Sequence, residues 1–247
     1  MDIKTTLNYS PNFNKKKRNK KKIKFIIFHY TGMDKESAAI KRLTNLQSEV
    51  SSHYLIKTNG EIITLVPNLY VAWHAGKSFW KKLKSLNKSS IGIEISNPGH
   101  SFKYKKFSKK QIRSILKLSK FLIKEYKINK YNILGHSDIA PNRKKDPGEK
   151  FPWEYLAKHK VGMWHTLPAK ILKTNRLKKI DLENKKNFYN NLLKIGYSLK
   201  NPKNIKKNIL SNFIVTAFQR RFRQELINGK IDQECLLISQ NLAKKLN

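Results

Sequence analysis

The sequence predicts an α+β fold, in which helices flank a central mixed β-sheet and a small three-helix C-terminal domain follows. Short runs of β-branched and aromatic residues, typical of strands, recur through the first part of the chain. One long stretch with the apolar spacing of a helix separates the last two runs, and only helical periodicity remains after about residue 180. With 247 residues, the chain is long enough for two domains of unequal size.

The N-terminal segment, residues 1–22, is polar and basic, and we expect an extended polybasic arm that leads into the first strand. The apolar run at 23–28 is shorter than the roughly 7 to 15 residues of a signal-peptide core. We therefore interpret it as a buried central strand that presents His29 at its C-terminal edge.

Local patterns predict the following elements. Residues 37–47 have the apolar spacing of a helix, and residues 52–57 and 61–66 flank an Asn-Gly turn as a β-hairpin. Residues 91–95 are the next expected strand, which carries Glu94.

The second half of the pattern is mainly helical. Residues 108–126 predict a long amphipathic helix that begins at a Ser cap and packs on the sheet. Residues 132–135 then return to the sheet and deliver His136. A Lys-rich connector, 161–180, precedes the C-terminal helical segment, 181–247.

The charge is strongly positive, because 53 Lys and Arg outnumber 16 Asp and Glu to give +37. Such an excess attracts polyanions, so a nucleic-acid binder is one hypothesis. The excess is mostly Lys, spread over nearly every segment together with abundant Ile and Asn, as AT-rich coding would produce. That distribution favours a compositional bias over a dedicated nucleic-acid surface.

The single cysteine, Cys235, excludes an intramolecular disulfide and is compatible with a cytoplasmic protein. No stretch approaches the roughly 18 apolar residues of a membrane span. We expect a cytoplasmic monomer, with a periplasmic or secreted location by a non-standard route as the alternative.

Three residues are candidate metal ligands: His29 and His136, each after a strand, and Asp146 in a loop bounded by Pro and Gly. Two imidazoles and a carboxylate leave one position of a tetrahedral Zn²⁺ open, as catalytic zinc requires. Such a zinc lowers the pKa of a coordinated water to roughly 7 and polarises a carbonyl. Any single histidine is weak evidence, since most histidines are packed or surface residues.

The case for a metal site is strengthened by five segments that follow one another along the chain: 28–31 (FHYT), 50–56 (VSSHYLI), 72–76 (AWHAG), 90–94 (SIGIE) and 135–141 (GHSDIAP). Together they resemble the type 2 (AmpD/AmiD-like) family of zinc-dependent N-acetylmuramoyl-L-alanine amidases. The likeness spans roughly residues 20 to 160. It implies a zinc amidase catalytic domain at 23–160 that hydrolyses the amide between N-acetylmuramic acid, or its anhydro form, and L-alanine.

The resemblance also implies roles for individual residues. It makes His29, His136 and Asp146 zinc ligands and assigns catalysis to Glu94 and Lys144. Glu94 would move a proton from the attacking water to the leaving amine, and Lys144 would stabilise the oxyanion.

Other polar residues receive weaker assignments. By resemblance, Trp73 and His74 line the substrate cleft, and His53 is a buried or pocket residue grouped with them as substrate-binding rather than a fourth ligand. Asp138 either orients His136 or caps a turn. Three histidines outside any motif are expected at the surface: His100, His159 and His165.

The C-terminal segment resembles the three-helix peptidoglycan-binding domain often appended to such amidases. The likeness rests on 188–197, on the 216–222 segment (TAFQRRF) and on 229–232 (GKID), whereas 201–208 departs from the usual pattern. The alternative is a helical cap that packs on the catalytic domain and binds nothing.

The expected partner is therefore peptidoglycan or its muropeptide fragments, with no dedicated nucleic acid and no membrane span. An anionic wall polymer suits the charge as well as nucleic acid does. A non-catalytic recognition module is the competing hypothesis, but such a module would be expected to lack part of the set that is complete here: His29, His136, Asp146, Glu94 and Lys144.

Overall fold

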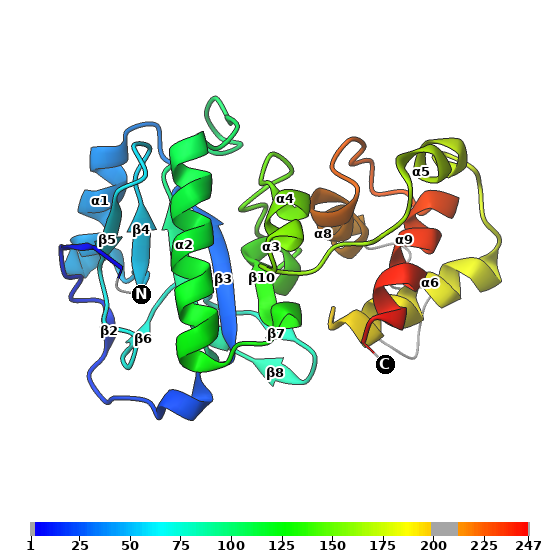
Figure 1. Cartoon of the computed structure of the whole chain (residues 1–247). Helices are drawn as coiled ribbons and strands as arrows, with labels where there is room; N and C mark the ends of the chain where they lie inside the picture. Colours follow the sequence, from blue (N-terminus) through cyan, green and yellow to red (C-terminus); the bar gives the residue numbers. More distant parts are fainter. Residues whose placement is uncertain (1–2, 199–211, 247) are drawn as a thin grey trace.

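The computed structural model describes residues 3–198 and 212–246. Its centre is a six-stranded sheet with the strand order β1-β5-β4-β9-β3-β10 (Figure 1). The strands are β1 (Thr6–Leu7), β3 (Phe25–Tyr30), β4 (Tyr54–Ile56), β5 (Ile62–Thr64), β9 (Ser90–Ile95) and β10 (Ile133–Gly135). β4 and β5 pair antiparallel and the other neighbours pair parallel, so the predicted mixed sheet and hairpin are confirmed.

Two small antiparallel ribbons lie beside the sheet: β2 (Phe13–Asn14) with β6 (Val71–Ala72), and β7 (Phe79–Trp80) with β8 (Leu83–Lys84). The helices of the sheet domain are α1 (Glu36–Thr44), α2 (Lys109–Tyr126), α3 (His136–Ile139) and α4 (Trp153–Lys158). Short 3-10 turns connect them: η1 (Lys20–Lys22), η2 (Leu46–Ser48), η3 (Leu86–Ser89) and η4 (Lys130–Asn132).

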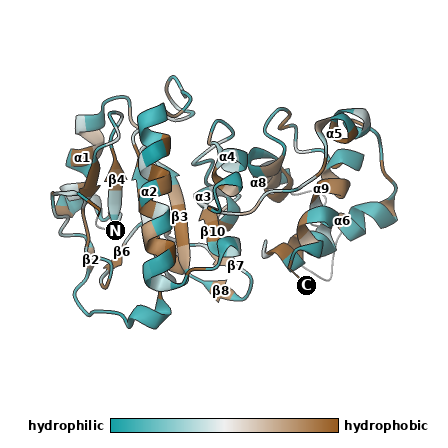
Figure 2. Ribbon diagram, viewed as in Figure 1, coloured by the Kyte–Doolittle hydropathy of each residue, from teal (hydrophilic) through white to brown (hydrophobic). Residues whose placement is uncertain are grey.

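Helix α2 crosses one face of the sheet, with its apolar stripe inward and its polar side outward (Figures 1 and 2). It begins where the sequence predicts, at Ser108, whose hydroxyl accepts from the Gln111 N–H at 3.1 Å. The Gln111 side chain accepts from the Ser108 N–H at 2.9 Å, which completes a capping box.

The two faces of the sheet differ in chemistry, because side chains alternate along each strand. Ile26 and Phe28 of β3 belong to the apolar core under α2, as do the isoleucines of β9, Ile91, Ile93 and Ile95. The intervening residues therefore face the opposite side. On that side, β3 presents His29 directly beside Glu94 of β9.

The N-terminal segment is part of the fold, which corrects the expectation of an extended arm at residues 1–22. β1 adds a parallel strand to the edge of the main sheet, and β2 pairs with β6. Arg18 is only 8% exposed and donates to the carbonyls of Asn68 and Ser90. Backbone oxygens accept the hydrogen bonds of the buried guanidinium. The basic composition of this segment therefore does not indicate that it is part of the fold.

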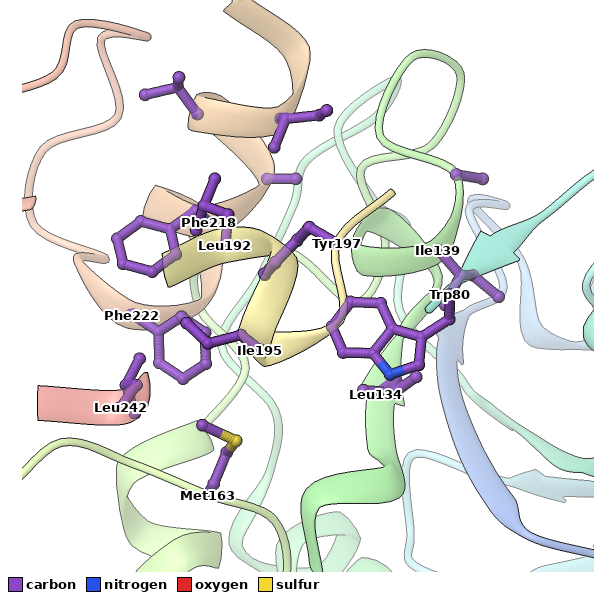
Figure 3. Close-up of a cluster of buried hydrophobic side chains, with 14 of the residues drawn as sticks. Trp80, Leu134, Ile139, Met163, Leu192, Ile195, Tyr197, Phe218, Phe222 and Leu242 are labelled. Carbon is purple, nitrogen blue, oxygen red and sulfur yellow. The ribbon is translucent and has the colours of Figure 1, made fainter. Parts of the chain in front are cut away.

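The C-terminal part is helical, as predicted, with α6 (Leu182–Ile195), α8 (Asn212–Phe222) and α9 (Gln233–Lys244), while α5 (Ala169–Asn175) lies in the expected connector. These helices share an apolar core with the sheet domain (Figure 3). Trp80 and Leu134 from the sheet domain meet Leu192, Phe218 and Leu242 there. The irregular stretch at 201–208 lies outside the described residues.

The packing of these helices agrees with the expected alternative of a helical cap. Binding of peptidoglycan by them stays a prediction. Among the described residues, no helix combines the length and apolar character that crossing a membrane requires.

Candidate active site

The three predicted ligands meet at one edge of the sheet. His29 is the penultimate residue of β3, His136 opens α3 directly after β10, and Asp146 lies in the loop beyond α3. Because β3 and β10 are parallel neighbours, their C-terminal ends lie at the same edge. The Ser137 N–H donates to the Asp146 carbonyl at 2.8 Å, and this hydrogen bond holds the loop against α3.

The ligand atoms face one another at close range. Nδ1 of His29 lies 2.9 Å from Nδ1 of His136 and 3.1 Å from Oδ2 of Asp146. The distance from Nδ1 of His136 to Oδ2 of Asp146 is 3.0 Å. All three residues are buried. Oxygen and nitrogen ligands at about 2.0 to 2.2 Å from a tetrahedral Zn²⁺ are roughly 3.3 Å apart, close to these separations.

The protonation of these groups also fits a cation. Nε2 of His136 lies 3.2 Å from the Ala75 carbonyl, which can only accept, so Nε2 carries the proton and Nδ1 presents a lone pair. Asp146 contributes a buried carboxylate oxygen to the same point. The donor set therefore fits a divalent metal ion.

Glu94 lies next to this cluster, in register with His29 across the β9 and β3 ladder. Its Oε2 is buried and has no hydrogen-bond partner among residues 3–198 and 212–246. Burial, and then the charge of Asp146, raise the pKa of Glu94 to about 8, although Lys144 opposes them. A carboxyl group in such surroundings is suited to exchange protons near neutral pH.

Lys144 is held by the turn after α3, where its backbone N–H donates to the Ala140 carbonyl at 3.0 Å. Both Lys144 and Lys145 line the cavity over the metal ligands. The positive charge of Lys144 acts to lower the pKa of both His29 and Glu94, which places it within electrostatic reach of both.

The cavity has a volume of about 520 Å³ and contains both the predicted ligands and the predicted catalytic residues in its wall. Trp73 and His74 also line it. The indole N–H of Trp73 donates to Asn14 at 2.6 Å, which fixes the ring at the rim of the cavity. The other wall residues are Tyr30, Thr31, Gly32, Met33, Ala39, Arg42, Leu43, Val50, Ser51, His100, Ser101 and Arg143.

His53 does not reach this cavity, so the expectation that it contacts substrate is corrected. The side chain is fully buried behind the ligands. Its Nδ1 accepts from the Gly92 N–H at 3.0 Å and its Nε2 lies 3.1 Å from the Tyr70 carbonyl. With both ring nitrogens in contact with backbone groups, His53 holds two strands together.

Asp138 caps the turn, which is one of its two expected roles, and also bridges to the C-terminal helices. It accepts from the Gly135 N–H at 2.8 Å. Tyr197 donates to Oδ1 at 2.6 Å, and Arg221 donates to Oδ2 at 2.5 Å. These partners are far away in the sequence, so no local pattern could have indicated them.

Two histidines expected at the surface are not simple surface residues. His100 lies 2.8 Å from the Tyr30 hydroxyl and 3.0 Å from Glu149, and it lines the cavity. His165 is only 9% exposed. Arg143 is a further cavity residue that sequence reasoning missed. Neither His100 nor Arg143 carries a sequence signal of its own, because the contacts that place them come from distant segments.

Comparison with protein families matches residues 19–149 to Amidase_2, described as N-acetylmuramoyl-L-alanine amidase. Among characterised proteins, the chain is similar to N-acetylmuramoyl-L-alanine amidase AmiD of Escherichia coli (strain K12). The two are 35% identical over 240 residues, which cover 91% of this chain and 83% of AmiD. It is also 41% identical over 113 residues to 1,6-anhydro-N-acetylmuramyl-L-alanine amidase AmpD of Haemophilus influenzae, covering 45% of this chain and 59% of AmpD.

Solved structures show the same likeness. The E. coli AmiD complex with anhydro-N-acetylmuramic acid-L-Ala-D-gamma-Glu-L-Lys superposes with a TM-score of 0.78 at 35% identity, covering 91% of this chain and 90% of AmiD. AmpDh3 from Pseudomonas aeruginosa, determined with anhydromuramic pentapeptide, gives a TM-score of 0.78 at 28% identity, covering 99% of this chain and 98% of AmpDh3.

Proposed function

The chain belongs to the N-acetylmuramoyl-L-alanine amidase family Amidase_2, and we propose that this amidase works with a zinc ion held by His29, His136 and Asp146. The bond it hydrolyses joins N-acetylmuramic acid, or its anhydro form, to L-alanine. The observation that carries the proposed site is the convergence of two imidazole nitrogens and one carboxylate oxygen within about 3 Å of one another.

A zinc ion held by His29, His136 and Asp146 would lower the pKa of a coordinated water to about 7 and would polarise the substrate carbonyl. The remaining chemistry belongs to the side chains around it. Glu94 accepts the proton that the attacking water loses and delivers it to the departing amine of L-alanine. Its pKa is raised to about 8 in the metal-free protein and would be lowered toward neutrality by a bound cation, where a carboxyl group can both accept and donate a proton.

Lys144 has an electrostatic role. Its ammonium group stabilises the negative charge that develops on the carbonyl oxygen as the tetrahedral intermediate forms. Trp73, fixed at the rim, offers an aromatic face against which a sugar ring or a peptide side chain can pack. These roles together use both walls of the cavity.

We further infer that both soluble anhydro-muropeptides and the polymer are substrates. The structures of AmiD and AmpDh3 that resemble this chain hold anhydromuramic peptides. The net charge of +37 favours accumulation on an anionic wall polymer. The retained set of five site residues argues against a recognition module that binds without cutting.

Mass spectrometry of reaction products tests the proposal. The purified protein is incubated with soluble anhydro-muropeptides or with intact sacculi, after chelation and again after zinc is restored. Release of L-alanyl peptides that stops on chelation and returns with zinc supports the reaction and the metal together. Activity that persists after exhaustive chelation contradicts the metal site, and strict preference for one substrate form contradicts the inference about both.

A further inference from the structure

His74 contacts a proposed metal ligand from behind, on the side away from the other two ligands. Its Nδ1 lies 3.0 Å from Nε2 of His29. Its Nε2 lies 3.1 Å from the hydroxyl of Ser90, and that hydroxyl donates to the Leu86 carbonyl at 2.7 Å. A continuous chain of hydrogen bonds therefore runs from a backbone carbonyl in η3 to the ring of His29.

The direction of this chain follows from its last member. The Leu86 carbonyl can only accept, so the single hydroxyl proton of Ser90 points at it. The oxygen of Ser90 is then an acceptor for a proton on Nε2 of His74.

The same reasoning continues into His29. A neutral imidazole carries one proton, so a His74 ring that donates from Nε2 to Ser90 has its acceptor at Nδ1. Nδ1 of His74 accepts from Nε2 of His29, and this leaves Nδ1 of His29 with its lone pair directed at Asp146 and His136. That is the tautomer in which His29 can bind a metal.

The surroundings of His74 keep its ring in this position. Gly92 lies against the ring, and a Cβ atom at that position would come within 2.4 Å of it. The side chain of Asn87 accepts from the backbone N–H groups of His74 and Ala75, at 3.2 and 2.7 Å. The ring is 8% exposed and packs edge-on against His29, with centroids 5.1 Å apart. These contacts leave little freedom for rotation.

We propose that His74 and Ser90 are positioning residues that fix the tautomer and orientation of His29, and through them its capacity to bind the metal. The proposal rests on the proposed function, in which His29 is a ligand. His136 reaches the same state by a shorter route, because its Nε2 donates directly to the Ala75 carbonyl. His29 instead depends on two intervening side chains, each acting as both donor and acceptor.

Two substitutions of matched shape test the role of His74. Leu and Asn have the same number of side-chain heavy atoms and the same branching at Cγ, but Asn can accept from Nε2 of His29 and Leu cannot. We expect H74L to weaken zinc binding by about 10- to 100-fold, the usual cost of losing a partner of a metal-bound histidine. We expect H74N to recover most of that loss. Zinc affinity is measured by competition with a chromogenic chelator.

A spectroscopic measurement separates positioning from general damage. In the chelated protein, histidine side-chain nitrogen chemical shifts report which ring nitrogen carries the proton. We expect His29 to be protonated on Nε2 in the wild type and in H74N, and to be a mixture of tautomers in H74L. S90A is a smaller change, which frees the His74 ring to exchange its own tautomer, and we expect a loss of only a few-fold in zinc affinity.

His53 supplies the control, since it is also buried and also contacts Gly92, but has no hydrogen bond to His29. We expect H53L to lower the thermal stability without changing zinc affinity. The positioning role is overturned if H74L and S90A both bind zinc as tightly as the wild type and keep the Nε2-protonated form of His29. If the wild type binds no zinc, or binds it equally well after H29A, the ligand assignment itself fails, which is a different result.

Discussion

Two buried carboxylates, Asp138 in α3 and Asp146 in the loop beyond it, have opposite surroundings. Asp138 accepts hydrogen bonds from Arg221, Tyr197 and the backbone N–H of Gly135. Asp146 faces two imidazole nitrogens across a cavity that opens to solvent. The protein satisfies Asp138 with its own donors, whereas the groups around Asp146 present lone pairs toward a shared point. Burial alone therefore does not indicate that a carboxylate is functional. A buried carboxylate that lines a cavity and lacks hydrogen-bond donors of its own is the better indicator.

The surroundings of Asp138 also show what the C-terminal helices contribute. Arg221 donates a further hydrogen bond to the Ile133 carbonyl at 2.8 Å and lies over the ring of Trp153. Tyr197 lies beside Trp80 in the apolar cluster between the two parts (Figure 3). One side of α3 is thus fixed by a distant segment while the other side carries a proposed ligand, His136.

The same substitution at the two aspartates should separate the two roles most clearly. We expect D146N to reduce zinc affinity by more than about 100-fold, the upper figure for losing only an orienting partner, and to abolish amidase activity. The chelated D146N protein should keep most of its stability, because no buried cation loses its counter-ion. Chelator competition and product analysis measure both.

We expect D138N to have the opposite effects, with stability lowered and zinc binding retained. It leaves the guanidinium of Arg221 buried without a counter-charge, a change that costs about 3 to 5 kcal/mol of the free energy of unfolding. Zinc affinity should stay within a few-fold of the wild type under conditions where the protein is folded. The comparison breaks down if D138N loses zinc binding as completely as D146N, as judged by urea unfolding and chelator competition on both proteins.

Glu94 is a third carboxyl group and, like Asp146, it lines the cavity. We expect E94Q to lower kcat by about 10²- to 10⁴-fold while zinc binding is retained, because the amide cannot accept a proton from water. A steady-state assay at several pH values checks this. Wild-type activity should rise with pH as Glu94 and the coordinated water ionise, and E94Q should keep only the rise that belongs to the water. Equal rates in the two proteins would remove Glu94 from the mechanism.

The two adjacent lysines form a matched pair in the cavity wall. We expect K144M to reduce kcat by about 10²- to 10³-fold, as loss of an oxyanion donor does, and K145M to leave kcat within a few-fold of the wild type. Both variants should bind zinc normally. The reverse order of effects would show that Lys145 carries the charge that stabilises the intermediate.

The smallest expected effect is on stability. Because the folded-state pKa of Glu94 is raised, from 4.5 to about 8, the folded chelated protein holds a proton that the unfolded chain releases. Stability should therefore fall as pH rises between these values, and E94Q should lack this loss. We expect the free energies of unfolding of the two chelated proteins to diverge by at most about 1.4 kcal/mol per pH unit over this range, measured by urea unfolding of both. Parallel pH profiles for the two would contradict the raised pKa.

The sequence predicted most of the sheet domain because its signals are local. The strand before His29, the Ser108 cap and the Asn-Gly hairpin each depend on neighbours within a few residues. The ends of parallel strands then bring His29 and His136 together without further information. Local pattern therefore reached the proposed ligands as well as the fold.

Contacts between distant polar side chains were not predictable in this way. Arg18 was assigned to a basic arm, although it is buried against backbone carbonyls. His53 joins backbone groups and does not line the cavity, whereas His74 lines the cavity and also contacts His29 from behind. Neither spacing nor composition records which buried donor meets which acceptor, since that depends on how the folded segments pack.

The shared apolar cluster has a consequence for cooperativity. Trp80 and Leu134 of the sheet domain pack in one core with Leu192, Phe218 and Leu242 of the C-terminal helices. The family match ends at residue 149, whereas the apolar core continues past that position. Unfolding of the C-terminal helices would remove the apolar wall that packs behind α3, so both parts should unfold in a single transition. A truncated chain would expose that wall to water and to other chains.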